Sequence, residues 1–371
     1  MKQTLKKKLP GPIFNSIRSI IHIVRSTNEK LEINSIKLAS NSKVLTEVFY
    51  LVKGNFWEEH QSVLKGRKAY YESLHAIGES CALLRRNTHR IEKGLIMKPR
   101  RDVFAEGFIL ETVKCYERAI DSSILANTEK KWATDVLDEY FKVVGSTQIT
   151  DSAKKIYISA RKEVSGLEPI IPMFPNDTSS FTPYPFKNLP SSKIEFEELK
   201  ELFISRRSVR WYQDKPVPIE LIQRAANIAS FAPSACNRQP YRFLFCNDKQ
   251  KTLAIADCAM GTTGFAENLP AIIAVVGDLS AYPAERDRHV IYIDGSLAAM
   301  QLMLALETLG LSTCPINWPD MQEREKRIRK IIKLKDYERI VMLMAVGYAD
   351  PTGGIPYSQK KENNLILKDI S

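Results

Sequence analysis

The stretch LKELFISRRSVRWYQ (Leu199–Gln213) joins an acidic amphipathic pattern to a cluster of positive charge. Apolar side chains at helical spacing predict a helix over Phe196–Ile204. Three arginines and a serine follow the helix at once, namely Arg206, Arg207, Ser208 and Arg210. Guanidinium groups bind phosphates and carboxylates through charge-assisted hydrogen bonds. The stretch therefore predicts a site for an anion.

The composition is that of a soluble globular protein with an anionic partner. The chain has 371 residues, of which 44% are hydrophobic and 26% are charged, and this balance argues against extensive disorder. A formal net charge of +11 favours a nucleotide, a phosphorylated substrate, a nucleic acid or a membrane surface as partner. We expect no nucleic acid, because the basic residues lack interleaved aromatics and a recognisable binding module.

The six cysteines are scattered and form no CxxC pair, and no secretory signal is evident. We therefore expect reduced thiols in a cytoplasmic protein, without a metal site. Near the N-terminus, apolar residues within 13–24 share one helical face. We favour a helix packed on the protein itself. The alternative is peripheral contact with the inner membrane face, aided by Lys6, Lys7 and Lys8.

The texture of the sequence changes twice along the chain. Residues 1–165 have helical patterns without an alternating strand, so they predict an all-α domain. Residues 166–193 are crowded with proline and small polar residues, which predicts an extended connector. Residues 194–371 mix helical patterns with apolar runs and predict an α+β domain.

The expected elements follow from these patterns. Helices are predicted over Lys65–Arg86, Phe104–Ile124, Thr134–Val144, Ile219–Phe231 and Arg288–Leu309. Buried strands are predicted in YRFLFCND (241–248), AIIAVVGD (271–278) and RIVMLMAVGYAD (339–350).

Three more segments accompany the arginine cluster: FAPSACNRQPYRF (231–243), LGLSTCPINWPD (309–320) and GYADPTGGIPYSQKKE (347–362). Taken singly, each has an ordinary structural explanation, such as a turn or a solvated basic end. Together and in this order they resemble the nitroreductase family of FMN-dependent oxidoreductases, over roughly the last 180 residues. The resemblance implies an α+β nitroreductase-like fold, with a mixed sheet flanked by helices and an all-α N-terminal extension. It also implies a homodimer.

The same resemblance implies that the motif residues bind FMN. These are Arg206, Arg207, Ser208, Arg210, Pro233, Ser234, Ala235, Asn237, Gln239, Pro315, Ile316, Asn317, Ser358, Lys360 and Lys361. Arg206 and either Lys360 or Lys361 would bind the phosphate, and Arg210 would approach N1 and the C2 carbonyl, where a cation favours the reduced ring. The turn from Pro233 would come from the partner subunit. A backbone N–H near Ile316 would face N5.

The implied activity is two-step hydride transfer from NAD(P)H through FMN to a nitro, quinone or enone-like acceptor, or to a larger tailoring substrate. No separate catalytic side chain is expected. One alternative is a flavin-dependent dehydrogenase or oxidase that acts in glycan or natural-product tailoring. Another is a non-catalytic scaffold that binds a membrane surface or a partner protein.

Two features depart from the compact family pattern. Asn317 and Trp318 replace the acidic residue and glycine that many members carry, so Trp318 is a candidate substrate contact. The basic segment LRRNTHRIEKGLIMKPRRDVF (84–104) lies in the N-terminal region. We interpret His89 and Arg90 there as candidates for binding an anionic substrate. A solvated basic helix is the alternative.

Overall fold

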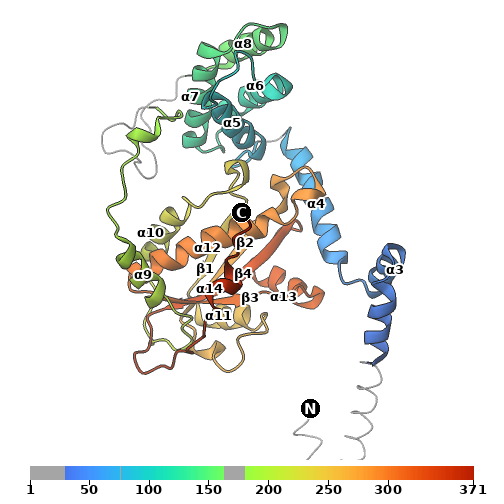
Figure 1. The fold of residues 1–371 in the computed structure, drawn as a ribbon, viewed down its shortest axis with the longest axis vertical. Helices are drawn as coiled ribbons and strands as arrows, with labels where there is room; N and C mark the ends of the chain where they lie inside the picture. The colour runs from blue at the N-terminus through green and yellow to red at the C-terminus, as the bar shows by residue number, and fades with distance from the viewer. Residues whose placement is uncertain (1–29, 76, 163–179) are drawn as a thin grey trace, which may run out of the picture. The chain divides into compact units, whose positions relative to one another are not determined.

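The computed structural model describes residues 30–75, 77–162 and 180–371. The chain divides into two compact units, residues 1–60 and residues 61–371 (Figure 1). The predicted helix within 13–24 lies outside the described residues, as do residues 163–179, where the predicted connector begins. The boundaries of the all-α domain and the connector therefore stay predictions.

In the first unit, residues 30–39 are helical and are followed by the helix α3 (Lys43–Lys53). α3 ends at Gly54, whose φ of 69° lies in the left-handed region that glycine adopts without steric cost. None of the residues of α3 is buried. The helix α4 (Trp57–Ser73) follows.

Four helices pack together in the N-terminal part of the second unit: α5 (Ala82–Leu95), α6 (Glu106–Ile120), α7 (Asn127–Val143) and α8 (Gln148–Ala160). Their core contains the buried side chains of Ile91, Val113 and Leu137. The predicted helical character of this region is confirmed, but the single helix over Lys65–Arg86 is wrong. α4 ends at Ser73, and the intervening Gly-Glu-Ser segment favours a turn over a continuing helix.

The C-terminal part holds a four-stranded sheet. Its strands are β1 (Tyr241–Cys246), β2 (Ala271–Asp278), β3 (Ser312–Asn317) and β4 (Glu338–Gly347), in the order β1-β2-β4-β3. The three predicted strands are confirmed, and β3 is an additional strand at one edge. All three strand pairs are antiparallel, and the parallel component is a single bridge between Ser208 and Thr313.

Alternate residues of β2 face two separate cores. Ile273 and Val275 pack with α10 (Ile219–Ala229) and α12 (Val290–Thr308). Ile272 and Ala274 belong to the core on the other face. The remaining helices are α9 (Phe196–Ser205), α11 (Lys249–Ala256), α13 (Gln322–Ile332) and the short α14 (Asn363–Ile366). Figure 1 shows α12 running along the sheet beside α10.

One segment in the described part of the chain, Glu285–Thr308, is long and apolar enough to cross a membrane by length and composition alone. It contains α12, whose Ala299, Leu302 and Leu306 are fully buried against the sheet. This packing is that of a core helix in a globular domain.

The C-terminal end of α4 closes the edge of this fold. Gly66 approaches Leu279 so closely that an added Cβ would lie 2.6 Å from the Cβ of Leu279. Val63 joins the same small core as Leu279 and Ile291. The N-terminal region therefore contributes directly to the packing of the α+β part.

Candidate functional site

The arginine cluster lies along the edge strand β3. Val209 N–H donates to the carbonyl oxygen of Thr313 at 3.0 Å, and Ser208 forms the parallel bridge to the same residue. Tyr212 Oη donates to the carbonyl oxygen of Val209 at 2.6 Å and fixes the segment from its other end. These bonds bring the predicted Arg206–Arg210 segment beside the predicted Pro315–Asn317 segment.

Arg206 and Arg210 both lie near enough to the buried thiol of Cys314 on β3 for their charges to act on it. Burial raises the pKa of Cys314, and the positive charges of Arg210 and Arg206 oppose that rise. Arg206 has the same effect on Glu307, whose pKa burial also raises. In the described residues no carboxylate forms an ion pair with either arginine. Both guanidinium groups are therefore available to an anion.

Arg207 connects the cluster to the C-terminal tail. Its Nη2 donates to the carbonyl oxygens of Pro356 at 3.1 Å and Tyr357 at 2.7 Å. Ser358 follows directly in a left-handed conformation, with a φ of 52°, and Lys360 and Lys361 are exposed beyond it. The tail that carries the predicted phosphate-binding lysines is thus held against the arginine segment.

The edge strand alternates between the core and solvent. Cys314 and Ile316 are buried, whereas Pro315 and Asn317 are exposed. β3 pairs with β4 on one side only, so its outer backbone edge is open beyond the bridge at Thr313. An open strand edge offers backbone donors to a ligand.

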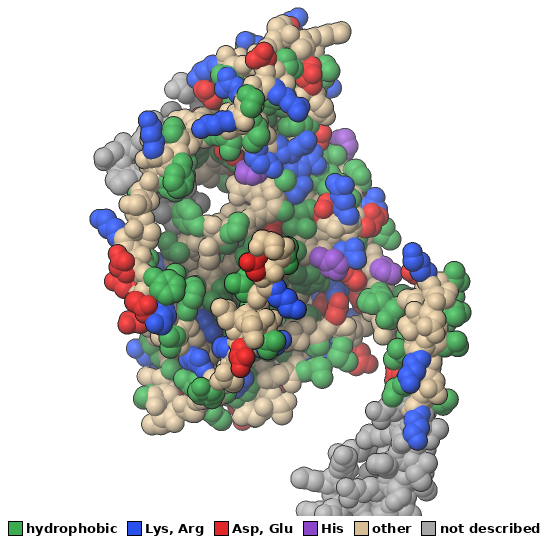
Figure 2. Space-filling view, viewed as in Figure 1, with side chains coloured by type: hydrophobic (Ala, Val, Ile, Leu, Met, Phe, Trp, Pro, Cys, Tyr) green, Lys and Arg blue, Asp and Glu red, His purple; other side chains and the backbone are tan. Residues whose placement is uncertain are grey.

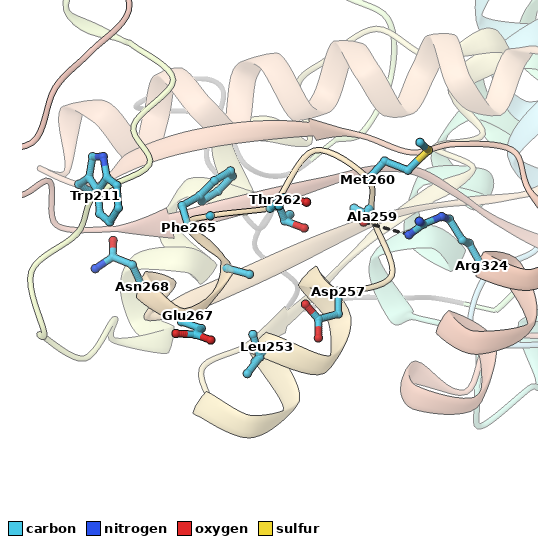
Figure 3. Close-up of a pocket in the computed structure, with 13 residues that line it drawn as sticks. Trp211, Leu253, Asp257, Ala259, Met260, Thr262, Phe265, Glu267, Asn268 and Arg324 are labelled. Atoms are coloured by element: carbon cyan, nitrogen blue, oxygen red, sulfur yellow. Dashed lines mark hydrogen bonds between the residues drawn. The ribbon is translucent and has the colours of Figure 1, made fainter. Parts of the chain in front are cut away.

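A cavity of about 970 Å³ lies next to the arginine cluster (Figure 3). The Cζ of Arg210 lies 5.8 Å from the centre of the Phe265 ring, which lines the cavity. Asp257 and Glu267 also line it, and Figure 3 shows both on the side away from Phe265. Arg324 is the one cation among the described lining residues, so the greater positive charge for an anionic group lies on the Arg206 and tail side.

The donors present fit FMN. Three guanidinium groups, the Ser208 hydroxyl and two tail lysines provide the positive charge and hydrogen-bond donors that a phosphate and a polyol require. The open edge of β3 provides neutral backbone groups for a ring. The chemistry of this donor set matches a phosphorylated flavin.

The turn around Asn237 has an unusual backbone. Cys236, Asn237 and Gln239 have φ values of 53°, 50° and 50°, in the left-handed region. Non-glycine residues in that region cost about 1–3 kcal/mol each unless the surroundings over-determine them. Here several hydrogen bonds do so.

Two residues outside the turn, Asp294 and Arg85, make three of these bonds. Asp294, buried on α12, accepts a hydrogen bond from Ala235 N–H at 2.9 Å. Arg85 on α5 donates to the carbonyl oxygen of Asn237 at 3.0 Å and to Oε1 of Gln239 at 3.3 Å. Inside the turn, Ser234 Oγ accepts a bond from Gln239 N–H at 3.1 Å.

Both outside anchors are held in turn by buried partners. Arg85 pairs with the buried carboxylate of Glu129 at 3.0 Å. Burial raises the pKa of Asp294, although Ala235 N–H and the Tyr282 hydroxyl stabilise its charged form. Sequence reasoning missed Asp294 because a single acid in an apolar helix carries no spacing signal. It included Arg85 only as part of a basic segment.

The structure therefore gathers the predicted cofactor residues into two groups. One group is the arginine segment, β3 and the tail. The other is the turn of Pro233 to Gln239, and no described hydrogen bond connects it to the first group.

The predicted substrate contacts lie in different surroundings. Arg90 lies over the ring of Phe108, 3.6 Å from its centre. His89 Nδ1 pairs with Glu92 at 3.1 Å. Trp318 is only 9% exposed, and its indole N–H donates to the buried Glu325 at 2.6 Å. That hydrogen bond directs the polar edge of Trp318 into the protein and leaves little of its surface for a substrate.

Comparison with known proteins finds a family model that matches part of the C-terminal half of the chain. Residues 204–263 and 256–348 match the model of the Nitroreductase family. A candidate NADH dehydrogenase/NAD(P)H nitroreductase of Archaeoglobus fulgidus is 28% identical over 154 residues, which cover 41% of this chain and 86% of that protein. Human iodotyrosine deiodinase 1 is 26% identical over 218 residues, which cover 50% of this chain and 72% of that protein.

A solved FMN-dependent nitroreductase from Clostridium difficile is 24% identical, with a TM-score of 0.39. The superposition covers 46% of this chain and 98% of that one.

Proposed function

We propose that this chain, whose residues 204–348 form a domain of the nitroreductase family, binds FMN and transfers hydride from NADH or NADPH to an organic acceptor. The chain is an oxidoreductase. The observation that carries the proposal is the convergence of Arg206, Arg207 and Arg210 with β3 and the basic tail. Nitro, quinone and enone-like compounds are the acceptors that we propose.

The residues divide the work of binding between them. Arg206 and one of the two tail lysines, Lys360 or Lys361, hold the phosphate, and Arg207 keeps the tail in reach. FMN, when bound, supplies the atom that accepts and returns the hydride. Arg210 provides a fixed positive charge beside the ring edge, and the open edge of β3 offers a backbone N–H near Ile316.

We propose that the active form is a homodimer, in which the turn of Pro233 to Gln239 completes the site of the partner subunit. Family members are generally dimeric. No described hydrogen bond links the turn to the arginine group of the same chain, which is consistent with this arrangement. A stripe on α12 supports it too, because Ile293, Leu297 and Met300 lie on one helical face and are 58%, 43% and 38% exposed.

The absorption spectrum of the purified protein tests the proposal. We expect flavin bands, and we expect anaerobic addition of NADH or NADPH to bleach them. Arg210→Ala should weaken retention of FMN, whereas Arg224→Ala, at an exposed position on α10, should not. A protein that stays colourless after incubation with excess FMN would contradict the proposal.

A further inference from the structure

Basic side chains from two parts of the chain gather beside the strained turn. α5 packs against the turn residues Ala235–Asn237, and Arg85 fastens the two together. Arg86 and Arg90 follow on α5, one helical turn apart, and Arg238 extends from the turn itself. Figure 2 shows several blue side chains gathered on the face where α5 lies in Figure 1.

Two carboxylates act on these three cations: Glu111 acts on Arg86 and Arg90, and Asp294 interacts with Arg238. Arg86 contacts Glu111 at 3.3 Å, and that carboxylate is 46% exposed. Arg90 lies on the face of Phe108, and the Cζ of Arg238 lies 4.8 Å from the centre of the Tyr282 ring. Aromatic faces hold a guanidinium in place without cancelling its charge.

Two further observations show that the cluster is incomplete. The Nε of Arg238 is buried without a hydrogen-bond partner, and so is Nδ2 of Asn87 between Arg86 and Arg90. Asn87 is fully buried, and its Oδ1 accepts bonds from both neighbouring arginines, which leaves only its donor unpaired. A buried donor without a partner is unfavourable in the folded protein.

The charges also repel one another. Burial lowers the pKa of Arg90, and the positive charges of Arg86 and Arg238 lower it further. Cys236 of the turn and Glu111 act on the pKa of Arg90 in the opposite sense. Arg90 therefore faces the turn that, in the proposed dimer, forms a wall of the flavin site.

Neighbouring basic residues on α5 have carboxylate partners of their own. Arg85 is neutralised by Glu129, and His89 pairs with Glu92. The cluster is thus limited to the side of α5 that carries Arg86 and Arg90.

We propose that Arg86, Arg90 and Arg238 form an oxyanion subsite, and that the electron acceptor carries a carboxylate or phosphate group that binds there. This inference rests on the proposed function, because it places the anionic group of the acceptor beside the flavin. Arg90 and Arg238 supply planar guanidinium donors, and Arg86 adds charge.

A matched set of acceptors tests the subsite. 4-Nitrobenzoate and 4-nitrophenyl phosphate each carry an oxyanion, and 4-nitrobenzamide is a neutral control of similar shape. We expect Arg90→Ala to lower kcat/KM for the anions about tenfold relative to the amide. Arg90→Lys keeps the charge and should give an intermediate loss. Arg101→Ala, which removes an exposed arginine outside the cluster, should leave the ratios unchanged. The anionic acceptor whose kcat/KM falls more in Arg90→Ala shows whether carboxylate or phosphate is the preferred group.

Calorimetry separates this inference from the proposed function. Benzoate and phenyl phosphate cannot accept hydride, so their binding to the full-length protein is measurable whether or not FMN is retained. We expect binding that weakens about tenfold in Arg90→Ala and less in Arg90→Lys. A protein that stays colourless but still binds these anions would contradict the proposed function and would support the subsite. The subsite would be overturned if two quantities were equal in all variants while thermal unfolding stayed unchanged. These are the ratio of kcat/KM for the anionic acceptors to that for the amide, and the affinity for benzoate and phenyl phosphate.

Discussion

Arg85 and Asn237 lie 152 positions apart in the sequence, yet the Nε of Arg85 donates a hydrogen bond of 3.0 Å to the carbonyl oxygen of Asn237. The bond connects α5 to a turn in which several residues adopt an energetically costly left-handed conformation. Removal of this bond should therefore release the turn while the rest of the sheet stays folded.

Arg85→Ala with Glu129→Gln tests that expectation. The second substitution removes the buried carboxylate that would otherwise lose its partner, since an unpaired buried charge costs about 3–5 kcal/mol by itself. We expect faster amide hydrogen exchange in residues 233–239, because the left-handed residues relax. Arg161→Ala removes a comparable pair with Asp138 elsewhere and should leave this exchange unchanged. Unchanged exchange in the double variant would show that Asp294 alone suffices.

Asp294 should make stability depend on pH in an identifiable direction. Burial raises its pKa above the ordinary value, so the charged form is penalised in the folded state. The penalty is absent below the unfolded-state pKa and grows as pH rises through the folded-state pKa. Asp294→Asn keeps an acceptor for Ala235 N–H and should be at least as stable as the wild type at pH 7. This advantage should shrink toward pH 4 in denaturant unfolding experiments.

The matching control is Asp294→Ala, which leaves Ala235 N–H without its acceptor. We expect a loss of about 1–3 kcal/mol in the free energy of unfolding. A difference between wild type and Asp294→Asn that is constant across the pH range would contradict the assigned pKa shift.

Arg207→Ala should free the C-terminal tail. Two carbonyl bonds, to Pro356 and Tyr357, are lost together. Each such bond is worth about 1 kcal/mol, so local opening should become several-fold more frequent. Trypsin should then cleave after Lys360 or Lys361 faster, as measured by mass spectrometry of timed digests. Arg224→Ala should digest at the wild-type rate, and an Arg207→Ala protein that does so too would argue against the tether.

Two helical glycines should respond to alanine in opposite directions. In Gly66→Ala the new Cβ would lie 2.6 Å from the Cβ of Leu279 and 2.9 Å from its backbone, so we expect a loss of about 1–3 kcal/mol. Gly107 on α6 has nothing within 4 Å of that position. Gly107→Ala should therefore gain up to about 1 kcal/mol from helix propensity. Chemical denaturation measures the free energy of unfolding of both variants. A Gly66→Ala protein as stable as the wild type would refute the close contact.

The exposed stripe on α12 should control assembly. Leu297→Asp places a charge in the middle of the face that carries Ile293 and Met300, and we expect it to convert a dimer to a monomer. Size-exclusion chromatography with light scattering measures the mass. Ile158→Asp changes an apolar residue on α8 that is even more exposed, and it should leave the mass unchanged. Loss of the dimer in both variants, or in neither, would count against this face as the interface.

Much of the fold follows from the sequence because its signals are local. β2 is a continuous apolar run, and α10 and α12 have uninterrupted helical patterns. The strand β3 was not predicted, because its segment is short, has polar ends and contains Pro315. Proline is tolerated there since β3 is an edge strand, a fact that only the sheet order reveals.

The site residues stay a prediction, and the structure shows which of them lie together. The proximity of the arginine segment to β3 followed from the family pattern. The left-handed conformations of Cys236 and Asn237 could not be predicted, because neither residue is a glycine. The anchors Arg85 and Asp294 reach the turn from distant segments, and the sequence carries no spacing between them that could be recognised.

The contact of α4 with the end of the sheet has a consequence for how the chain can be shortened. Arg339 is 1% exposed, and Ser62 is one of its few partners beside Asp320 and Glu325. A fragment that began at residue 194 would uncover Leu279 and open a water path to this guanidinium. Residues 62–66 of α4 thus cover part of the C-terminal half, and we expect that half, expressed by itself, to be less stable and more prone to aggregate.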